Sequence, residues 1–521
     1  MTRPVRLLAG VAFAALLGGT AAMRAPAVLA SSASCESVAS IAITGGTITS
    51  AAAVDAGAFV APAIPGAPSN STAFAKLPPF CRVAATLRPS SDSDIKIEVW
   101  MPVSGWNGKF EGVGNGGWSG NIAYSSLAAQ LARGYATAST DTGHAGSAVD
   151  GSFALGHPEK LVDFGFRAVH EMTVTAKAIV AAYYGRAPRL SYWNGCSSGG
   201  KQGLKEAQKF PADYDGIVAG APANYWTHLM AGSIWIAQAS LKDPASLIPP
   251  EKYAVVHKAV LDACDARDGV TDGVIESPPA CHFDPASIQC GAEDRADCLT
   301  APQVETARHI YGPATNPRTH EKIFPGLAEG SELGWGGLAG ARPLPIAVDH
   351  FKYVVFKDPN WDFKTFDFDK DVALADKVDG GLLNATDPHM EAFFGRGGKI
   401  VMYHGWSDQL ISPQNSIDYY DSVEAARRGS RNAASGRNDI RLFMVPGMAH
   451  CAGGAGPNTF DALGALEQWV EQKKAPDEIP ASQMTGGAVV RTRPLCPYPQ
   501  TASYKGSGST DDAASFVCRA Q

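Results

Sequence analysis

The sequence predicts an α/β fold, in which a mostly parallel β-sheet is covered by helices on both faces and is interrupted by one large insertion. Two observations lead to this prediction. Short apolar strands alternate with helical segments over residues 94–222. The alternation stops over residues 225–395 and resumes with buried-strand patterns at residues 399–403 and 440–445. We therefore expect a core of residues 31–224 and 396–521 and a lid domain of residues 225–395.

The first thirty residues have the layout of a secretory signal peptide. Arg3 and Arg6 give a positive start, residues 7–17 are apolar and uncharged, and small residues follow up to Ala30. The apolar run is too short for a membrane span, and no later stretch approaches the length of one. We therefore expect residues 1–30 to be removed and the mature protein to be secreted or periplasmic, without a membrane partner.

The composition narrows the classes of partner and the redox compartment. The formal net charge is −7 with both signs interspersed, which argues against nucleic acid and anionic membranes as partners. Ten cysteines in an exported chain indicate disulfides, because the close spacing of a zinc site does not occur. Proximity along the chain suggests the pairs Cys35–Cys81, Cys264–Cys281, Cys290–Cys298 and Cys496–Cys518, which leaves Cys196 and Cys451.

The elements of the core are predicted in chain order. Residues 95–101 alternate apolar and polar side chains, as in a half-exposed strand. Residues 109–113 form a second strand, and the glycine-rich loop of residues 114–120 follows where lipases and esterases supply one oxyanion amide. This loop lacks the Lys and Ser/Thr of a phosphate-binding loop. Further elements are strands at residues 135–139, 190–194 and 214–220 and helices at residues 166–184 and 460–473.

The segment Gly195-Cys-Ser-Ser-Gly199 is the centre of the predicted chemistry. It matches G-x-S-x-G and lies between a predicted strand and a run of good helix formers, which is the setting of a nucleophile elbow. A serine on so sharp a turn has a strained backbone, and glycines two residues to either side let strand and helix pass closely. The helix start points free amides and a positive dipole end at the place of an oxyanion. We expect Ser197 to be the nucleophile, and a Ser/Gly-rich loop that only turns is the alternative.

Two loops provide the partners of this serine. In α/β-hydrolases the nucleophile, the acid and the histidine follow one another in that order along the chain. Asp408 and His450 lie on loops directly after the strands at residues 399–403 and 440–445, where open α/β sheets place their chemistry. We expect His450 to take the proton of Ser197 and Asp408 to fix the tautomer of the imidazole. For His450 alone, a histidine hydrogen-bonded in a loop is the alternative.

Cys196 and Cys451 directly adjoin the predicted nucleophile and histidine. If Ser197 and His450 meet, their chain neighbours come within about 6 Å between Cα atoms, which is disulfide range. A Cys196–Cys451 bond would clamp the two loops and limit the drift that lowers rates steeply. Two separately buried thiols are the alternative.

The Cys-Ser pair at residues 196–197, Asp408 and the His-Cys pair at residues 450–451 resemble the pattern of the tannase and feruloyl esterase family of α/β-hydrolases. Mono(2-hydroxyethyl) terephthalate hydrolase is similar in the same places. The resemblance implies that the five disulfides pair as proximity suggests, and that the oxyanion amides belong to Gly117 and Ser198. It also implies hydrolysis of esters of aromatic acids such as gallate, ferulate or terephthalate, with an aromatic-lined lid over the site.

The acidic loop of residues 264–274 matches the calcium site of that family. The resemblance implies three carboxylate and two backbone-carbonyl ligands, a set that suits a hard cation. The loop is not an EF-hand, because Arg267 and Gly269 stand where that loop needs oxygen ligands. We expect a structural calcium ion in the lid and no organic cofactor, and a solvated Asp/Gly turn is the alternative. The implied ligands are Asp265, Asp268, Val270, Asp272 and Val274.

The sequence thus predicts a secreted serine ester hydrolase that cleaves esters of phenolic acids, such as feruloyl or galloyl esters, through an acyl-enzyme. The alternatives are an enzyme of the terephthalate-monoester type, a hydrolase of a different acyl bond, and a non-catalytic protein that binds aromatic ligands. His404 is interpreted as a wall of the substrate pocket. The terephthalate enzyme holds its substrate's carboxylate with a lid arginine, for which Arg342 is the nearest candidate in a differing sequence context. We expect neutral phenolic esters to be preferred, because a free carboxylate is costly to desolvate unless a fixed cation meets it.

Overall fold

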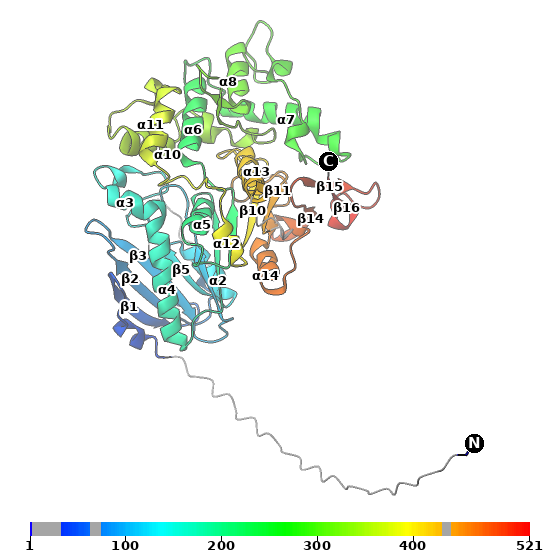
Figure 1. The fold of residues 1–521 in the computed structure, drawn as a ribbon. Coiled ribbons are helices and arrows are strands. Elements are labelled where there is room, and N and C mark those ends of the chain that lie inside the picture. The colour runs from blue at the N-terminus through cyan, green and yellow to red at the C-terminus, as the bar shows by residue number, and fades with distance from the viewer. Residues whose placement is uncertain (3–32, 63–73, 430–438, 521) are drawn as a thin grey trace.

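The computed structural model describes residues 1–2, 33–62, 74–429 and 439–520. Residues 3–30 of the predicted signal peptide lie outside the described residues. The described chain forms a large sheet flanked by helices, with a further group of helices beyond one end of its strands (Figure 1). No helix in these parts of the chain is long and apolar enough to cross a membrane.

The main sheet has nine strands in the order β1-β2-β3-β5-β4-β6-β7-β10-β11. Strands β5, β4, β6, β7, β10 and β11 run parallel to one another, whereas β1, β2, β3 and β5 pair antiparallel. The predicted mostly parallel sheet is confirmed, and β1 and β2 add an edge that the sequence pattern does not predict. The bounds are β1 Gly46–Val54, β2 Phe80–Leu87, β3 Ile95–Pro102, β4 Lys109–Val113, β5 Ala136–Thr140, β6 Leu190–Cys196, β7 Gly216–Gly220, β10 Lys399–Gly405 and β11 Ile440–Val445.

Helices cover both faces of this sheet. Neighbouring side chains of a strand point to opposite faces. Trp193 and Ile217 accordingly join the core that packs under α4, α5 and α13, whereas Tyr192 and Val218 join the core under α14. The central strands are buried on both sides, which is typical of a parallel sheet between two helical layers. The bounds are α2 Tyr124–Ala132, α3 Pro158–Val162, α4 Ala168–Tyr184, α5 Ser198–Lys209, α13 Pro413–Gly429 and α14 Ala462–Gln472.

The segment between β7 and β10 is mainly helical and adds no strand to the main sheet. Helices α6, α7, α8, α10 and α11 lie together at the top of Figure 1. Their apolar side chains form two cores of their own, and α6 contributes to both, with Ile234 in one and Ile236 in the other. Met390 and Phe393 belong to the core of the sheet, so packing on the sheet resumes before the boundary predicted at residue 395. The bounds are α6 Trp226–Ser240, α7 Tyr253–Cys264, α8 Ala301–Tyr311, β8 Ala314–Thr315, β9 Lys322–Phe324, α9 Gly336–Ala339, α10 Pro345–Asp349, α11 Lys370–Asp379 and α12 Glu391–Gly395.

The C-terminal tail forms two small antiparallel sheets beside the lid. Strands β12 (Thr459–Phe460), β13 (Ile479–Thr485) and β14 (Ala488–Leu495) form one sheet, and β15 (Gln500–Tyr504) and β16 (Phe516–Ala520) form the other. Val270 of the acidic lid loop packs in one apolar cluster with Cys496, Ala502 and Phe516 of this tail. The tail therefore fixes the acidic loop of the lid to the C-terminal half of the core.

Candidate active site

Ser197 stands on the sharp turn between β6 and α5. Its backbone has φ +63° and ψ −124°, a conformation that a non-glycine residue rarely adopts. The amide of Ser197 donates to the carbonyl of Gly220 (3.0 Å), and its carbonyl accepts from the amide of Ala223 (3.1 Å). These bonds to the end of β7 hold the strained turn in place. The serine lies at the carboxyl end of the parallel strands, as a nucleophile elbow requires.

The glycines around Ser197 are needed because backbones pass one another closely. A Cβ atom at Gly195 would lie 2.5 Å from the backbone of Gly199, and one at Gly114 would lie 2.6 Å from the Cα of Gly199. A Cβ atom at Gly200 would collide with the carbonyl oxygen of Gly220. The steric reason predicted for the glycines of the G-x-S-x-G segment is therefore present in the structure.

Asp408 and His450 form a hydrogen-bonded pair. Asp408 Oδ2 lies 2.7 Å from Nδ1 of His450, and its Oδ1 accepts from the amides of Leu410 (2.9 Å) and Ile411 (3.0 Å). Burial alone would raise the pKa of the fully buried Asp408, but the charge of His450 and hydrogen bonds from His404 and His450 hold that pKa well below its usual range. Because this carboxylate is ionised, Nδ1 of His450 donates to it and Nε2 keeps its lone pair free to accept a proton.

His404 lies inside the protein. Its side chain is fully buried, and Nε2 donates to Asp408 Oδ2 (3.0 Å) and to the carbonyl of Ile411 (3.1 Å). Its Nδ1 atom lies 2.7 Å from the hydroxyl of Ser416. Both ring nitrogens are therefore engaged by the protein. The interpretation of His404 as a substrate-binding residue is wrong, because its buried imidazole holds the carboxylate of Asp408 instead.

A disulfide joins the two loops that carry Ser197 and His450. The Cα atoms of Cys196 and Cys451 are 5.9 Å apart, so the residues that follow and precede them in the chain are held in neighbouring loops. A second link is the amide of His450, which donates to the side-chain oxygen of Gln409 (3.1 Å) and ties the histidine loop to the acid loop. All five predicted disulfides form, namely Cys35–Cys81, Cys196–Cys451, Cys264–Cys281, Cys290–Cys298 and Cys496–Cys518.

The two predicted oxyanion residues are in direct contact. The hydroxyl of Ser198 donates to the carbonyl of Gly117 (2.9 Å). Ser198 is the first residue of α5, and the amide of such a residue has no acceptor within its helix. Gly117 has φ +57°, and a Cβ atom there would collide with the carbonyl of Ala148. The glycine-rich loop after β4 thus reaches the start of α5, beside the nucleophile.

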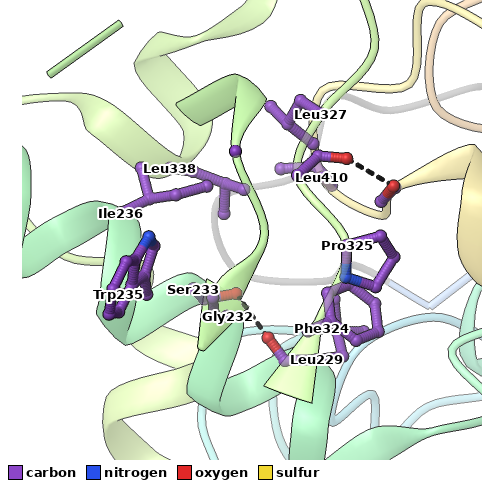
Figure 2. Close-up of a pocket in the computed structure, with 14 residues that line it drawn as sticks. Leu229, Gly232, Ser233, Trp235, Ile236, Phe324, Pro325, Leu327, Leu338 and Leu410 are labelled. Carbon is purple, nitrogen blue, oxygen red and sulfur yellow. Dashed lines mark hydrogen bonds between the residues drawn. The ribbon is translucent and has the colours of Figure 1, made fainter. Parts of the chain in front are cut away.

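A small cavity lies where the lid meets the acid loop (Figure 2). Its volume is about 10 Å³, which is room for one water molecule at most. Apolar side chains of α6 and of the segment around Phe324 form most of its wall, and Leu410, two residues after Asp408, closes one side. The hydroxyl of Ser412 donates to the carbonyl of Gly326 (2.5 Å) across this junction. This region therefore packs the lid onto the acid loop and does not hold a ligand.

A larger cavity of about 220 Å³ borders the same loops. Ser407 and Gln409 flank Asp408, and Ala449 precedes His450; all three line this cavity. Its other walls come from α7, from the acidic loop and from residues 330–334 of the lid. A buried cavity of about 150 Å³ holds a benzene ring, so this space is large enough for a ring-sized group.

The acidic loop carries the residues predicted to bind calcium. Asp265 is buried, and its carboxylate accepts from the amides of Asp272 (3.2 Å) and Gly273 (2.9 Å). Burial, reinforced by the charges of Asp272 and Asp265, raises the pKa of Asp268 to about 6. Arg493 of β14 donates to Asp272 (2.5 Å) and offsets part of this negative charge. Oxygen donors are the kind that a hard cation prefers, and such a cation would share Asp272 with Arg493 and with Arg491 (3.3 Å).

Arg342 lies on the lid, three residues before α10, and its side chain is exposed. Helix α10 approaches the oxyanion loop, because the indole of Trp118 donates to the carbonyl of Ile346 (3.1 Å). Arg342 is therefore on a segment next to the site, but no described contact fixes its guanidinium toward Ser197.

Comparison with known proteins agrees with this geometry. The family described as tannase and feruloyl esterase matches residues 81–519. The chain belongs to this family. It is 39% identical to an uncharacterised esterase of Xanthomonas campestris pv. campestris, over 94% of this chain and 91% of that one. It is 36% identical to a probable feruloyl esterase B-1 of Aspergillus flavus, over 84% of this chain and 86% of that one.

Solved structures of the tannase and feruloyl esterase family have the same fold. Feruloyl esterase B from Aspergillus oryzae superposes with a TM-score of 0.85 at 31% identity, covering 93% of this chain and 99% of that one. Tannin acyl hydrolase from Aspergillus niger superposes with a TM-score of 0.77 at 22% identity, covering 93% and 95%, and shows a shared fold. The protein is thus a carboxylic ester hydrolase with an α/β-hydrolase core.

Proposed function

We propose that the protein is a secreted serine esterase that hydrolyses esters of phenolic acids through an acyl-enzyme. The observation that carries this proposal is the 2.7 Å contact between His450 Nδ1 and the buried carboxylate of Asp408, on a loop that a disulfide ties to the strained turn of Ser197. In this arrangement Asp408 engages Nδ1 of His450 and leaves Nε2 to act as the base, on a loop held beside the turn of Ser197.

The proposed reaction has two halves. His450 Nε2 takes the proton of the Ser197 hydroxyl as its oxygen attacks the ester carbonyl, and the amides of Gly117 and Ser198 stabilise the resulting oxyanion. The imidazolium returns the proton to the departing alcohol, which leaves the acid bound to Ser197 as an ester. A water molecule, deprotonated by His450, then attacks this acyl-enzyme and releases the free acid. Asp408 holds the imidazole and stabilises its charged form throughout.

The proposed substrate class rests on the relatives and on the exposure of Arg342. The cavity of about 220 Å³ borders the acid and histidine loops, but Ser197 and His450 are not among the residues that line it. One relative is described as a probable feruloyl esterase B-1, and a solved structure at 31% identity is described as feruloyl esterase B. Arg342 is exposed, so it is not a buried cation that could meet a substrate carboxylate. We therefore assign neutral phenolic esters as the preferred substrates.

Secretion and calcium binding belong to the same proposal. The five disulfides favour an oxidising compartment, and the N-terminal sequence has the layout of a signal peptide. A calcium ion held by Asp265, Asp268 and Asp272, with carbonyls of Val270 and Val274, would fix the lid loop to the tail. The ion would neutralise the carboxylates of that loop and would take no part in the reaction at Ser197.

A panel of esters tests the proposal. Methyl ferulate, methyl gallate, methyl p-coumarate, p-nitrophenyl acetate and mono(2-hydroxyethyl) terephthalate are compared by kcat/KM, with Ser197→Ala as control. Turnover of the phenolic esters that is lost in Ser197→Ala is expected. Aromatic binding without turnover by the folded wild type would favour the non-catalytic alternative. A preference for the terephthalate monoester that Arg342→Ala abolishes, without effect on ferulate, would overturn the assigned substrate class.

A further inference from the structure

Three ionisable side chains meet on the helical layer of the core, on a part of α5 remote from Ser197. They are His170 of α4, Glu206 of α5, and Asp213 of the loop between α5 and β7. One nitrogen or oxygen atom from each lies within 4.8 Å of those from the other two. Within this group, His170 Nδ1 and Asp213 Oδ2 are 2.7 Å apart. The group therefore joins two helices and the connection that leads into the next strand.

Glu206 is the unexplained member of this group. Only 1% of its surface is exposed, and neither carboxylate oxygen has a hydrogen-bond partner among the described residues. Burial and the neighbouring Asp213 raise the pKa of Glu206 well above its usual range, and Lys177 offsets this only in part. The amine of Lys177 instead donates to the backbone carbonyl of Asp213. Two buried carboxyl groups in contact need either a proton or a cation between them.

We propose that His170, Glu206 and Asp213 bind a divalent transition-metal ion of the zinc type. An imidazole nitrogen with two carboxylate oxygens is a donor set that suits zinc and its neighbours, whereas calcium and magnesium prefer oxygen alone. The two negative charges of Glu206 and Asp213 balance the two positive charges of the ion. The ring of Phe210 stacks on the His170 imidazole with centroids 3.8 Å apart, which fixes its orientation. The His170 side chain is 29% exposed, so an ion can enter from solvent.

The bound ion has a structural role. Helix α5 begins at Ser198, and Glu206 stands eight residues further along, which is about 12 Å at the rise of an α-helix. The ion therefore does not reach an ester at Ser197. It ties the helix that follows the nucleophile to α4 and to the connection before β7. Loading should raise thermal stability and leave kcat unchanged.

The competing account is a shared proton. A protonated Glu206 would donate a hydrogen bond to Asp213 and no ion would bind. Glu206→Gln separates the two accounts, because the amide can still donate to Asp213 but supplies no negative charge to a metal ion. Under the shared-proton account this variant should be as stable as the metal-free wild type.

The experiment uses the full mature chain, stripped with a chelator and then resupplied with excess calcium. Zinc chloride is titrated by isothermal calorimetry, and melting curves are recorded with and without zinc. We expect saturable binding of one zinc ion per chain and a rise in Tm of a few degrees. Both effects should disappear in His170→Ala and Glu206→Gln. They should persist in His157→Ala, which removes a surface histidine paired with Asp92 alone (3.0 Å).

Absence of saturable zinc binding by the wild type would overturn the proposal, as would equal binding by wild type and Glu206→Gln. If His170→Ala fails to fold, crystals of the wild type soaked in zinc decide the question. An anomalous peak among the three side chains supports the site, and a soaked crystal without that peak contradicts it. Loss of esterase activity in Ser197→Ala is independent of all these outcomes, so failure here does not affect the proposed function.

Discussion

Nε2 of His404 lies 3.0 Å from Oδ2 of Asp408, and both side chains are fully buried. The same oxygen accepts the hydrogen bond of His450 at 2.7 Å. The hydroxyl oxygen of Ser416 lies 2.7 Å from Nδ1, the other nitrogen of the His404 ring. The carboxylate that orients His450 is therefore itself oriented by a second histidine, and the geometry assigns His404 a positioning role.

Replacing His404 should slow the chemical step without weakening substrate binding. A hydrogen bond to a charged group contributes about 1.5–3 kcal/mol, so we expect His404→Ala to lower kcat roughly 10- to 100-fold with KM nearly unchanged. Steady-state kinetics with methyl ferulate measure both constants. Ser416→Ala, which removes only the outer partner of the ring, should have a smaller effect. A rise in KM with kcat unchanged would contradict the positioning role of His404.

Removing the disulfide between the nucleophile and histidine loops should lower both activity and stability. In the double variant Cys196→Ser/Cys451→Ser the loops are free to drift, and we expect kcat to fall at least about tenfold. The matched control is Cys290→Ser/Cys298→Ser, which opens a short loop in the lid with a sequence separation of 8 and should leave kcat unchanged. Equal kcat values for the two double variants would show that the clamp does not position the site.

The buried imidazole of His144 should make the protein sensitive to acid. Burial lowers its pKa from 6.5 to about 4, and only 5% of its surface is exposed. As the pH falls below 6.5, His144 binds a proton in the unfolded chain but stays neutral in the folded chain, so acid favours unfolding. This contribution to stability is complete above pH 6.5 and is lost progressively down to about pH 4, at about 1.4 kcal/mol per pH unit.

His144→Gln tests this dependence, because a glutamine amide can replace the Nε2 donor to the carbonyl of Trp118 (2.7 Å) without titrating. Urea unfolding at several pH values between 4 and 7 should show a shallower loss of stability in this variant than in the wild type. His157→Gln, which makes the same substitution at an exposed position, is the matched control. Identical slopes for wild type and His144→Gln would contradict the prediction.

Chelation should destabilise the lid loop without abolishing the chemistry. An ion at a hundredfold excess over its dissociation constant stabilises the folded state by about 2.7 kcal/mol, so a chelator and Asp268→Asn should each lower Tm. Asp262→Asn, on the exposed face of α7 beside Lys258, is the control and should leave Tm unchanged. Initial rates at low temperature should persist in all three samples. If neither the chelator nor Asp268→Asn moves the melting curve, the loop is an ordinary Asp/Gly turn.

Much of the core is predictable from local pattern because parallel strands buried on both faces are continuous apolar runs. Residues 440–445 coincide with β11, and residues 109–113 coincide with β4 although Glu111 interrupts the apolar run there. The edge strand β1 escapes prediction because it is an Ala-, Ser- and Thr-rich strand whose side chains are mostly exposed or half-buried, so its sequence shows no clear alternation. Partner strands rather than its own pattern determine that it forms.

The sequence predicts some residues of the site and not others. Chain order and the strand ends point to Ser197, Asp408 and His450, and the pairing of Cys196 with Cys451 follows from their positions. The role of His404 does not follow, because a histidine four residues before an aspartate looks the same whether it faces a pocket or the interior. The meeting of Glu206 with His170 is also invisible in the sequence, since it depends on how α4 packs beside α5.

The central claim is that Ser197 carries the acyl group during turnover. The direct measurement is intact-protein and peptide mass spectrometry of the wild type quenched with acid during hydrolysis of methyl ferulate. We expect a fraction of the protein to carry one feruloyl group, located on the peptide that contains Ser197, and none in Ser197→Ala. Turnover of methyl ferulate by Ser197→Ala at the rate of the wild type, or a feruloyl group on another residue, would contradict the account.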